Sequence, residues 1–245
     1  MGQIHWLGPQ DSFPNPRLAA DSDPSVPGLI AVSERIYPNQ LLQAYQMGIF
    51  PWYSDEQPVL WWSPDPRMVL KPGNFRCSDS LRKNIRHFCQ DTHGKLLVDA
   101  DFGAVIRACA TSTRKDQDGT WITHEIMEAY TTLHEQGNAH SIALVEHGEL
   151  IGGLYCVAIG GMVFGESMFS RKPNASKMAL AALAAWCMQH QVGMIDCQQE
   201  TAHLRSLGGA PIARSEFLEA LQISLNQSNI EIPWNFDKNI LTHWL

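Results

Sequence analysis

Apolar runs and turn residues form their clearest pattern between residues 150 and 168. Two apolar runs meet there at Gly160-Gly161. This dipeptide is typical of a tight turn, so the pattern predicts a β-hairpin over about residues 150–168. In the second run a single carboxylate, Glu166, interrupts apolar or small residues. A carboxylate in that position is either a structural hydrogen-bond acceptor at a strand end or part of a chemical site.

A helix and a short strand are predicted to follow the hairpin. Asn174 occupies an N-cap position before strong helix formers, whose larger apolar residues recur at helical spacing: Leu180, Leu183, Trp186 and Cys187. After Gly193, residues 195–198 are enough for one strand. Side chains alternate along a strand, so Asp196 and Gln198 should share one face, with Ile195 and Cys197 on the other. The acid and the amide together form the chemical site that the pattern favours.

The order of elements predicts an α/β fold in two parts. From about residue 96 it is strand-helix-helix-strand-strand-strand-helix-strand-helix-strand-helix, which is typical of helices around a mixed sheet. Residues 1 to about 36 have no clear period, and the proline-rich run from Ser63 to Pro66 permits neither a helix nor a central strand. We therefore expect a small N-terminal domain over residues 1–65 and a larger domain over residues 66–245. The tail after Asn226 has no informative pattern.

Composition narrows the class of protein. Hydrophobic residues make up 44% and charged residues 18%, as in ordinary globular proteins. No apolar run approaches the ~18 residues of a membrane span, and the N-terminus lacks the basic start and apolar core of a secretory signal. The six cysteines form no CxxC pair, and the ten histidines form no HxxxH or HxH pattern. We therefore expect reduced thiols, no bound metal and a cytoplasmic location.

The net charge of −7 argues against general nucleic-acid binding. Two local clusters of residues, one basic and one aromatic, need a separate explanation. One surrounds a helix predicted to start after Ser78 and is either a solvated helix face or a patch for a few phosphates; its residues are Arg76, Arg82, Lys83, Arg86 and His87. The other is either the core of a small domain or a stacking surface for a base or peptide; its residues are Phe50, Trp52, Tyr53, Trp61 and Trp62.

Eight short strings, read together and in register, resemble one family. They are Ala44-Tyr45, Gly48-Ile-Phe-Pro-Trp52, Trp61-Trp-Ser-Pro-Asp-Pro-Arg67, Gly119-Thr-Trp-Ile-Thr123, His140-Ser-Ile142, Gly165-Glu-Ser-Met-Phe-Ser-Arg171, Asn174-Ala-Ser-Lys177 and Ile195-Asp-Cys-Gln198. From about residue 28 to 220 the chain resembles the bacterial leucyl/phenylalanyl-tRNA–protein transferases. The resemblance implies a small N-terminal domain joined to an acetyltransferase-like domain with a mixed, mostly antiparallel sheet flanked by helices. It also implies transfer of Leu or Phe from aminoacyl-tRNA to proteins with N-terminal Arg or Lys, which marks them for degradation.

The implied reaction gives the polar residues their expected roles. The donor ester is already activated, so the site must only hold the ester and amine together, accept a proton and stabilise the developing oxyanion. Our hypothesis gives Asp196 an orienting or basic role, acting with Gln198 on the incoming amine, while Glu166 contacts the cationic acceptor. The ribose hydroxyl of the tRNA is an alternative carrier of the proton. No cofactor is needed, and we expect a monomer.

The resemblance also implies binding residues. An apolar pocket for the donor amino acid is expected from Leu154, Val163, Leu180, Leu183 and Ile195, although strand alternation turns Ile195 away from Asp196. Several of these differ from the usual family choices, so the preference between Leu and Phe stays open. Trp52 and Trp121 match positions that face the terminal adenosine and the amino acid. The tRNA acceptor stem is expected on Arg76, Arg82, Lys83 and Arg86.

Two other functions are compatible with parts of the pattern. An acyl-CoA N-acetyltransferase of the same fold should carry a glycine-containing pyrophosphate loop before the central helix, but residues 170–177 include no glycine. A non-enzymatic adaptor for N-terminal residues would need an acidic pocket, but neither the basic helix nor the Asp196 and Gln198 pair. An aminoacyl-transfer assay separates both from the transferase.

Overall fold

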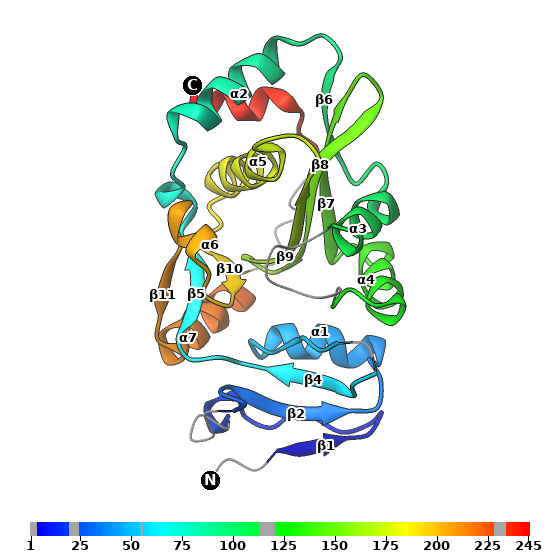
Figure 1. Cartoon of the computed structure of the whole chain (residues 1–245). Coiled ribbons are helices and arrows are strands. Elements are labelled where there is room, and N and C mark those ends of the chain that lie inside the picture. Colours follow the sequence, from blue (N-terminus) through cyan, green and yellow to red (C-terminus); the bar gives the residue numbers. More distant parts are fainter. Residues whose placement is uncertain (1–3, 20–24, 55, 113–120, 228–233) are drawn as a thin grey trace.

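The computed structural model describes residues 4–19, 25–54, 56–112, 121–227 and 234–245. In this part of the chain the strands form two sheets, one below the other in Figure 1. The smaller sheet has the order β1-β2-β4-β3, with β1 parallel to β2 and the other neighbours antiparallel. Its strands are β1 (His5–Leu7), β2 (Leu29–Ser33), β3 (Phe50–Pro51) and β4 (Val59–Trp62). Helix α1 (Pro38–Gln46) lies between this sheet and the rest of the molecule.

The larger sheet is mixed and mostly antiparallel, which confirms that part of the prediction. Among the described residues it has the order β11-β5-β10-β9-β8-β7-β6, and only β9 and β10 run parallel. Its strands are β5 (Arg67–Leu70), β6 (Gly94–Val98), β7 (Ala139–Glu146), β8 (Glu149–Ile159), β9 (Met162–Ser170), β10 (Ile195–Gln198) and β11 (Ala210–Ile212). The site residues predicted from the sequence therefore lie on adjacent central strands.

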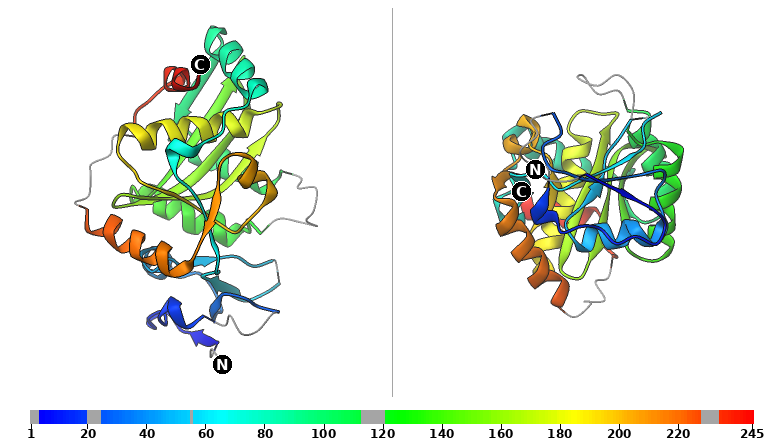
Figure 2. Two further views of the ribbon diagram at one scale, coloured as in Figure 1. Left: turned by 90° about the vertical axis from the view of Figure 1, so that its left-hand side faces the viewer. Right: turned by 90° about the horizontal axis from the view of Figure 1, so that it is seen from below.

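Helices cover both faces of the larger sheet. Helices α3 (Phe102–Ala110) and α4 (His124–Glu135) pack on one face, while α2 (Asp79–Gln90) and α5 (Ala175–Gln189) pack on the other (Figure 1). The α3 and α4 side shares an apolar core with α1 and the smaller sheet, and the α5 side forms a separate core. Helices α6 (Ala202–Ser206) and α7 (Arg214–Asn226) follow β10, with β11 between them (Figure 2).

The predicted hairpin is confirmed as β8 and β9. Gly160, at its turn, has a φ of +56°, and a Cβ atom there would lie 2.7 Å from the carbonyl oxygen of Ser224. A glycine is required for both reasons, because other residues are strained at positive φ and the backbone oxygen cannot rotate away. The sequence pattern thus predicts where the turn lies, and the packing of α7 against it requires a glycine at position 160.

The prediction that Asn174 occupies the N-cap position of α5 is confirmed. Its φ is +65°, however, and its side chain makes no capping hydrogen bond. Instead Nδ2 donates to Ser80 Oγ at 3.3 Å and to Asn84 Oδ1 at 3.1 Å. The amide therefore ties the start of α5 to the basic helix α2. The helix that follows β10 in the predicted order is short, since α6 covers only Ala202–Ser206.

In the C-terminal tail, residues 234–245 pack in a place that their pattern did not predict. A 3-10 helix, η3 (Lys238–Trp244), packs against α2 and α5 (Figure 2). Trp244 Nε1 donates to the Ala181 carbonyl at 2.9 Å, and the Trp234 ring stacks on His140 with centroids 3.9 Å apart. The tail is therefore part of the core on the α5 side.

The domain division at residues 65 and 66 stays a prediction. The smaller sheet ends at Trp62 and β5 begins at Arg67, but the core that contains Tyr45 of α1 continues to Tyr130 of α4. None of the described helices combines the length and apolar character needed to cross a bilayer.

Candidate active site

Two β-bulges lie next to one another where β9 meets β10. In β9, Tyr155 pairs with Ser167 and Cys156 with Gly165, so Glu166 is the extra residue. In β10, Asp196 pairs with Val69 and Gln198 with Met68, so Cys197 is extra. A bulge redirects the side chains around it and often occurs beside an active site. The expected alternation nevertheless holds: Ile195 and Cys197 pack on the α5 side of the sheet, while Asp196 and Gln198 bond to Arg67 and Glu166 on the other side.

The carboxylate of Glu166 is the centre of a hydrogen-bonded network. Tyr130 of α4 donates its hydroxyl to Oε2 at 3.0 Å, and Gln198 donates Nε2 to Oε1 at 3.0 Å. Tyr45 of α1 is hydrogen-bonded to the Tyr130 hydroxyl. The structure thus brings Glu166 and Gln198 together as predicted, and it adds two tyrosines that the sequence reasoning did not place in the site. The only signal for Tyr45 was its family string.

Burial raises the pKa of Glu166 from 4.5 to about 7. Hydrogen bonds from Tyr45, Tyr130 and Gln198 oppose that rise, while the negative charge of Asp196 adds to it. Burial and the charge of Glu166 raise the pKa of Tyr45 and Tyr130 well above the usual range, so both hydroxyls stay protonated donors. The pKa of Glu166 therefore lies close to neutral pH.

Asp196 has a different environment. Its side chain is completely buried, and the guanidinium of Arg67 occupies both oxygens, with Nε 2.8 Å from Oδ1 and Nη2 2.6 Å from Oδ2. Oδ1 also accepts the backbone N–H of Gln198 at 2.9 Å. Of the two roles expected for Asp196, this geometry favours the orienting one, because both carboxylate oxygens are already held by the bidentate guanidinium and one also accepts the backbone N–H of Gln198.

The five aliphatic residues expected in the amino-acid pocket lie in one cluster on the α5 side of the sheet. All are buried, at 6% exposure or less: Leu154, Val163, Leu180, Leu183 and Ile195. The aromatic residues beside Glu166 belong to the other cluster, with α1 and α4. Ile195 therefore points away from Asp196, as strand alternation requires. These five side chains lie together, as predicted, but they pack as part of the hydrophobic core. Their role in a binding pocket stays a prediction.

Trp52 and Trp121 lie on the same side of the sheet as Tyr45 and Tyr130. Trp52 is half-buried; Trp62 donates its indole N–H to the Trp52 carbonyl at 2.7 Å and packs edge-on against its ring. Trp121 is 8% exposed. The Gly119 and Thr120 of its family string lie outside the described residues.

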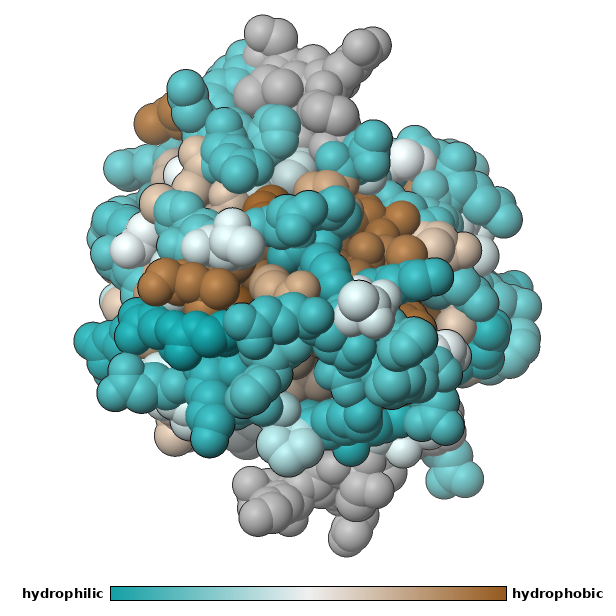
Figure 3. All heavy atoms as spheres, turned by 90° about the horizontal axis from the view of Figure 1, so that it is seen from above, coloured by the Kyte–Doolittle hydropathy of each residue, from teal (hydrophilic) through white to brown (hydrophobic). Residues whose placement is uncertain are grey.

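The basic helix is confirmed as α2, capped by Ser78 Oγ, which accepts the Leu81 N–H at 3.2 Å. Arg76, Lys83 and Arg86 are exposed. Arg82 is not a free cation, because its Nε donates to the Trp244 carbonyl at 3.0 Å and Nη1 to Asp79 at 3.2 Å. Three of the four cations of the expected patch are therefore exposed, while Arg82, with a side chain 40% exposed, is also bonded within the protein. Polar residues cover most of this end of the molecule (Figure 3).

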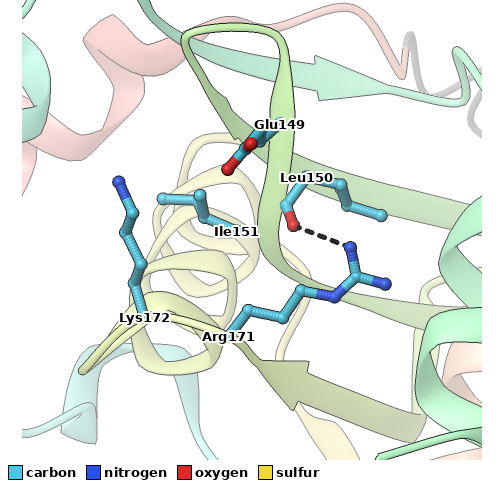
Figure 4. A pocket seen from close by; sticks show the side chains of 5 residues that line it. All are labelled: Glu149, Leu150, Ile151, Arg171 and Lys172. Atoms are coloured by element: carbon cyan, nitrogen blue, oxygen red, sulfur yellow. Dashed lines mark hydrogen bonds between the residues drawn. The ribbon is translucent and has the colours of Figure 1, made fainter.

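The loop before α5 forms a hollow of about 430 Å³ with the start of β8, and Arg171 and Lys172 extend to either side of Ile151 (Figure 4). Both cations are engaged within the protein. Arg171 Nη1 donates to the Leu150 carbonyl at 3.2 Å, and Lys172 Nζ lies 2.6 Å from Glu146 Oε2. In the described residues no group of three His, Cys, Asp or Glu side chains is arranged to hold a metal ion.

Sequence comparisons with known proteins identify the family of this chain. The sequence model of the leucyl/phenylalanyl-tRNA protein transferase matches residues 69–222, and that of its N-terminal domain matches residues 35–65. The leucyl/phenylalanyl-tRNA–protein transferase of Cupriavidus taiwanensis is 54% identical over 98% of this chain and 96% of its own. That of Paraburkholderia xenovorans is 52% identical over 97% and 96%.

A solved GCN5-related N-acetyltransferase from Kribbella flavida overlaps 75% of this chain and 64% of its own, at 14% identity and a TM-score of 0.34. A superposition that loose carries no weight in the assignment. The two family models and the full-length relatives do: the chain belongs to the leucyl/phenylalanyl-tRNA protein transferase family.

Proposed function

We propose that this protein transfers Leu or Phe from aminoacyl-tRNA to the α-amine of proteins with N-terminal Arg or Lys, and so marks them for degradation. Membership of the family makes the protein an aminoacyltransferase that uses aminoacyl-tRNA and a protein acceptor. The single observation that supports the finer assignment is the Glu166 carboxylate, which is held between Tyr130 and Gln198.

The reaction needs positioning more than it needs a nucleophilic side chain. The acceptor α-amine has an ordinary pKa of about 7.7–8.0, so roughly a tenth is neutral at pH 7. The amine attacks the ester carbonyl, the developing oxyanion collapses, and the bond to the tRNA ribose oxygen breaks. In our hypothesis Gln198 orients the amine through its amide, held in turn by Asp196. The proton lost by the amine passes to the leaving ribose oxygen or to Glu166.

Glu166 is suited to a cationic acceptor. A buried carboxylate with a raised pKa is stabilised when an opposite charge comes within about 4–6 Å. A guanidinium or ammonium group beside Glu166 would supply that charge, whereas a neutral first residue would leave the carboxylate unpaired. This is the physical reason to expect Arg and Lys, and not Leu or Ala, at the acceptor N-terminus.

The remaining assignments rest on the resemblance. We place the donor side chain against the aliphatic cluster on the α5 side, the terminal adenosine against Trp52 and Trp121, and the acceptor stem on Arg76, Lys83 and Arg86. We further propose a monomer that works in the cytoplasm without a cofactor.

A peptide panel tests this proposal. Peptides that differ only in the first residue are incubated with radiolabelled Leu-tRNA and Phe-tRNA, and an Arg peptide with an acetylated N-terminus serves as control. We expect label on Arg and Lys peptides alone and none on the blocked control. Equal transfer to an Ala peptide contradicts the role of Glu166, and no transfer to any peptide contradicts the function itself.

A further inference from the structure

A buried arginine at the junction of the two sheets contacts Asp196 of the candidate site. Arg67 begins β5 and is completely buried. Besides the bidentate pair with Asp196, its Nη1 donates to the Gly48 carbonyl at 3.0 Å. Its guanidinium lies 4.8 Å from the centroid of the Phe50 ring and 4.4 Å from that of Phe217. One side chain thus connects β10, the turn before β3 and α7.

This arrangement depends on the shape of the guanidinium and not only on its charge. Three separate N–H groups of Arg67 are used at once, toward two oxygens of Asp196 and one of Gly48. The guanidinium carbon also lies over the rings of Phe50 and Phe217. A lysine ammonium has the same charge but is a compact point on a flexible stem, so it cannot reproduce the fork.

The ion pair between Arg67 and Asp196 constrains the backbone of Gln198. Asp196 Oδ1, which Arg67 holds, also accepts the Gln198 backbone N–H at 2.9 Å. Gln198 has a φ of +62°, a conformation that residues other than glycine adopt only when their surroundings stabilise it. In this conformation its side-chain amide reaches Glu166. The direction of the Gln198 side chain therefore depends on where Asp196 is held.

We propose that Arg67 is a positioning residue for aminoacyl transfer, which fixes Asp196 so that Asp196 fixes the Gln198 amide toward Glu166. This rests on the proposed function. The bond to Gly48 extends the same control to the segment that leads to Trp52, so Arg67 also sets the N-terminal part of the site relative to β10. Arg67 touches none of the reacting atoms in this scheme and acts only through its neighbours.

A double-mutant cycle tests the proposal. Leu transfer from Leu-tRNA to an Arg peptide is measured for wild type, Arg67→Lys, Gln198→Ala and the double variant. Arg67→Lys should lower kcat by about tenfold or more in the wild-type background but by less than about twofold when Gln198 is already absent. An equal fall in both backgrounds, or a lower Tm with unchanged kcat, overturns the proposal. A wild-type protein without transfer would instead refute the proposed function.

Two further measurements keep the result decisive. If Gln198→Ala has no measurable turnover, a crystal structure of Arg67→Lys decides. The proposal expects the bond from Gln198 Nε2 to Glu166 Oε1 to be lost, and retention of that bond refutes it. If Arg67→Lys does not fold, Asp196→Asn takes its place in the same cycle with the same expected pattern.

Arg214 offers a matched control. It is also a buried arginine at this junction, and its Nη1 donates to the Ser63 carbonyl at 2.8 Å. Arg214→Lys should lower Tm while kcat stays within about twofold of wild type. If Arg214→Lys lowers kcat as much as Arg67→Lys does, the effect is general destabilisation and the proposal fails.

Discussion

Glu166 receives hydrogen bonds from side chains that lie 36 positions before it and 32 positions after it in the chain. The sequence marks the residue as an isolated carboxylate in an apolar run, but its neighbours in sequence say nothing about these partners. Burial then raises its pKa to about 7. Asp196, also a carboxylate on an inner strand, is instead held by Arg67. Two acids of the same predicted site therefore have different chemistry.

The raised pKa of Glu166 predicts a pH-dependent effect on stability. Because the folded protein binds this proton more tightly than the unfolded chain does, the contribution is complete below the ordinary pKa of 4.5 and is lost as the pH rises through about 7. The Glu166→Gln variant has a neutral side chain at every pH, so its unfolding free energy should not show this decrease. Between pH 5 and pH 8, wild type should lose roughly 2–3 kcal/mol more than the variant, measured by urea unfolding.

Glu135→Gln is the control for this measurement, because Glu135 is an exposed carboxylate on the same helix as Tyr130. Its unfolding free energy should follow the wild-type pH dependence. If wild type and Glu166→Gln show parallel pH dependence, Glu166 does not titrate near pH 7 in the folded state.

At the scale of elements, the hairpin and the helix after it were predictable because both are local. The turn at Gly160 and the apolar runs on either side define β8 and β9, and the alanine-rich run defines α5. The bulges at Glu166 and Cys197 were not predictable, since a bulge depends on the register of the neighbouring strand. The φ of +62° at Gln198, next to the second bulge, was likewise not predictable from the pattern.

Three glycine substitutions separate local strain from tertiary contact. Gly160→Ala meets both a positive φ and the Ser224 oxygen, so it should cost about 2–4 kcal/mol of unfolding free energy. Gly148→Ala has a φ of +82° but open space, so about 1 kcal/mol is expected. Gly193→Ala has open space and no positive φ, and should stay within about 0.5 kcal/mol. If Gly160→Ala and Gly148→Ala lower the free energy of unfolding equally, the close contact between α7 and the hairpin turn does not contribute to the cost.

At the scale of the whole molecule, the site is assembled from α1, α4 and the larger sheet, and residues 238–244 pack at the other end, against α2 and α5. Tyr45 comes from the N-terminal part, Tyr130 from α4 and Gln198 from β10. The tail reaches α2, where the Trp244 carbonyl holds Arg82. This leaves Lys83 and Arg86 as the exposed cations of the helix.

Lys83 and Arg86 should contact the tRNA, and Arg82 should mainly hold the tail. Lys83→Ala with Arg86→Ala is expected to raise the KM for Leu-tRNA and to reduce the slope of log KM against log salt by about 2, with Tm unchanged. Arg82→Ala should instead lower Tm. An unchanged salt slope in the double variant would exclude this face from tRNA binding.

We expect the protein to lose stability when the ring of Trp234, which stacks on Trp186 and His140, is removed. The Trp234 ring lies 4.0 Å from that of Trp186 and 3.9 Å from that of His140. Trp234→Ala should therefore cost about 2 kcal/mol in urea unfolding, less than a fully buried aromatic residue because Trp234 is half-buried. Ile223→Ala, at a side chain 66% exposed, should cost less than about 0.5 kcal/mol. Equal costs would mean that the tail does not contribute to the core.

The sequence by itself determined the hairpin, the helix after it, the basic helix and the family, because each follows from residues close together or from strings in a fixed order. Only the tertiary structure decided that Arg67 saturates Asp196, that Glu166 joins two tyrosines and Gln198, and that the tail engages Arg82. These contacts join residues that are tens to more than a hundred positions apart. Burial and pairing set the charge of a side chain, and neither is encoded by its neighbours in the chain.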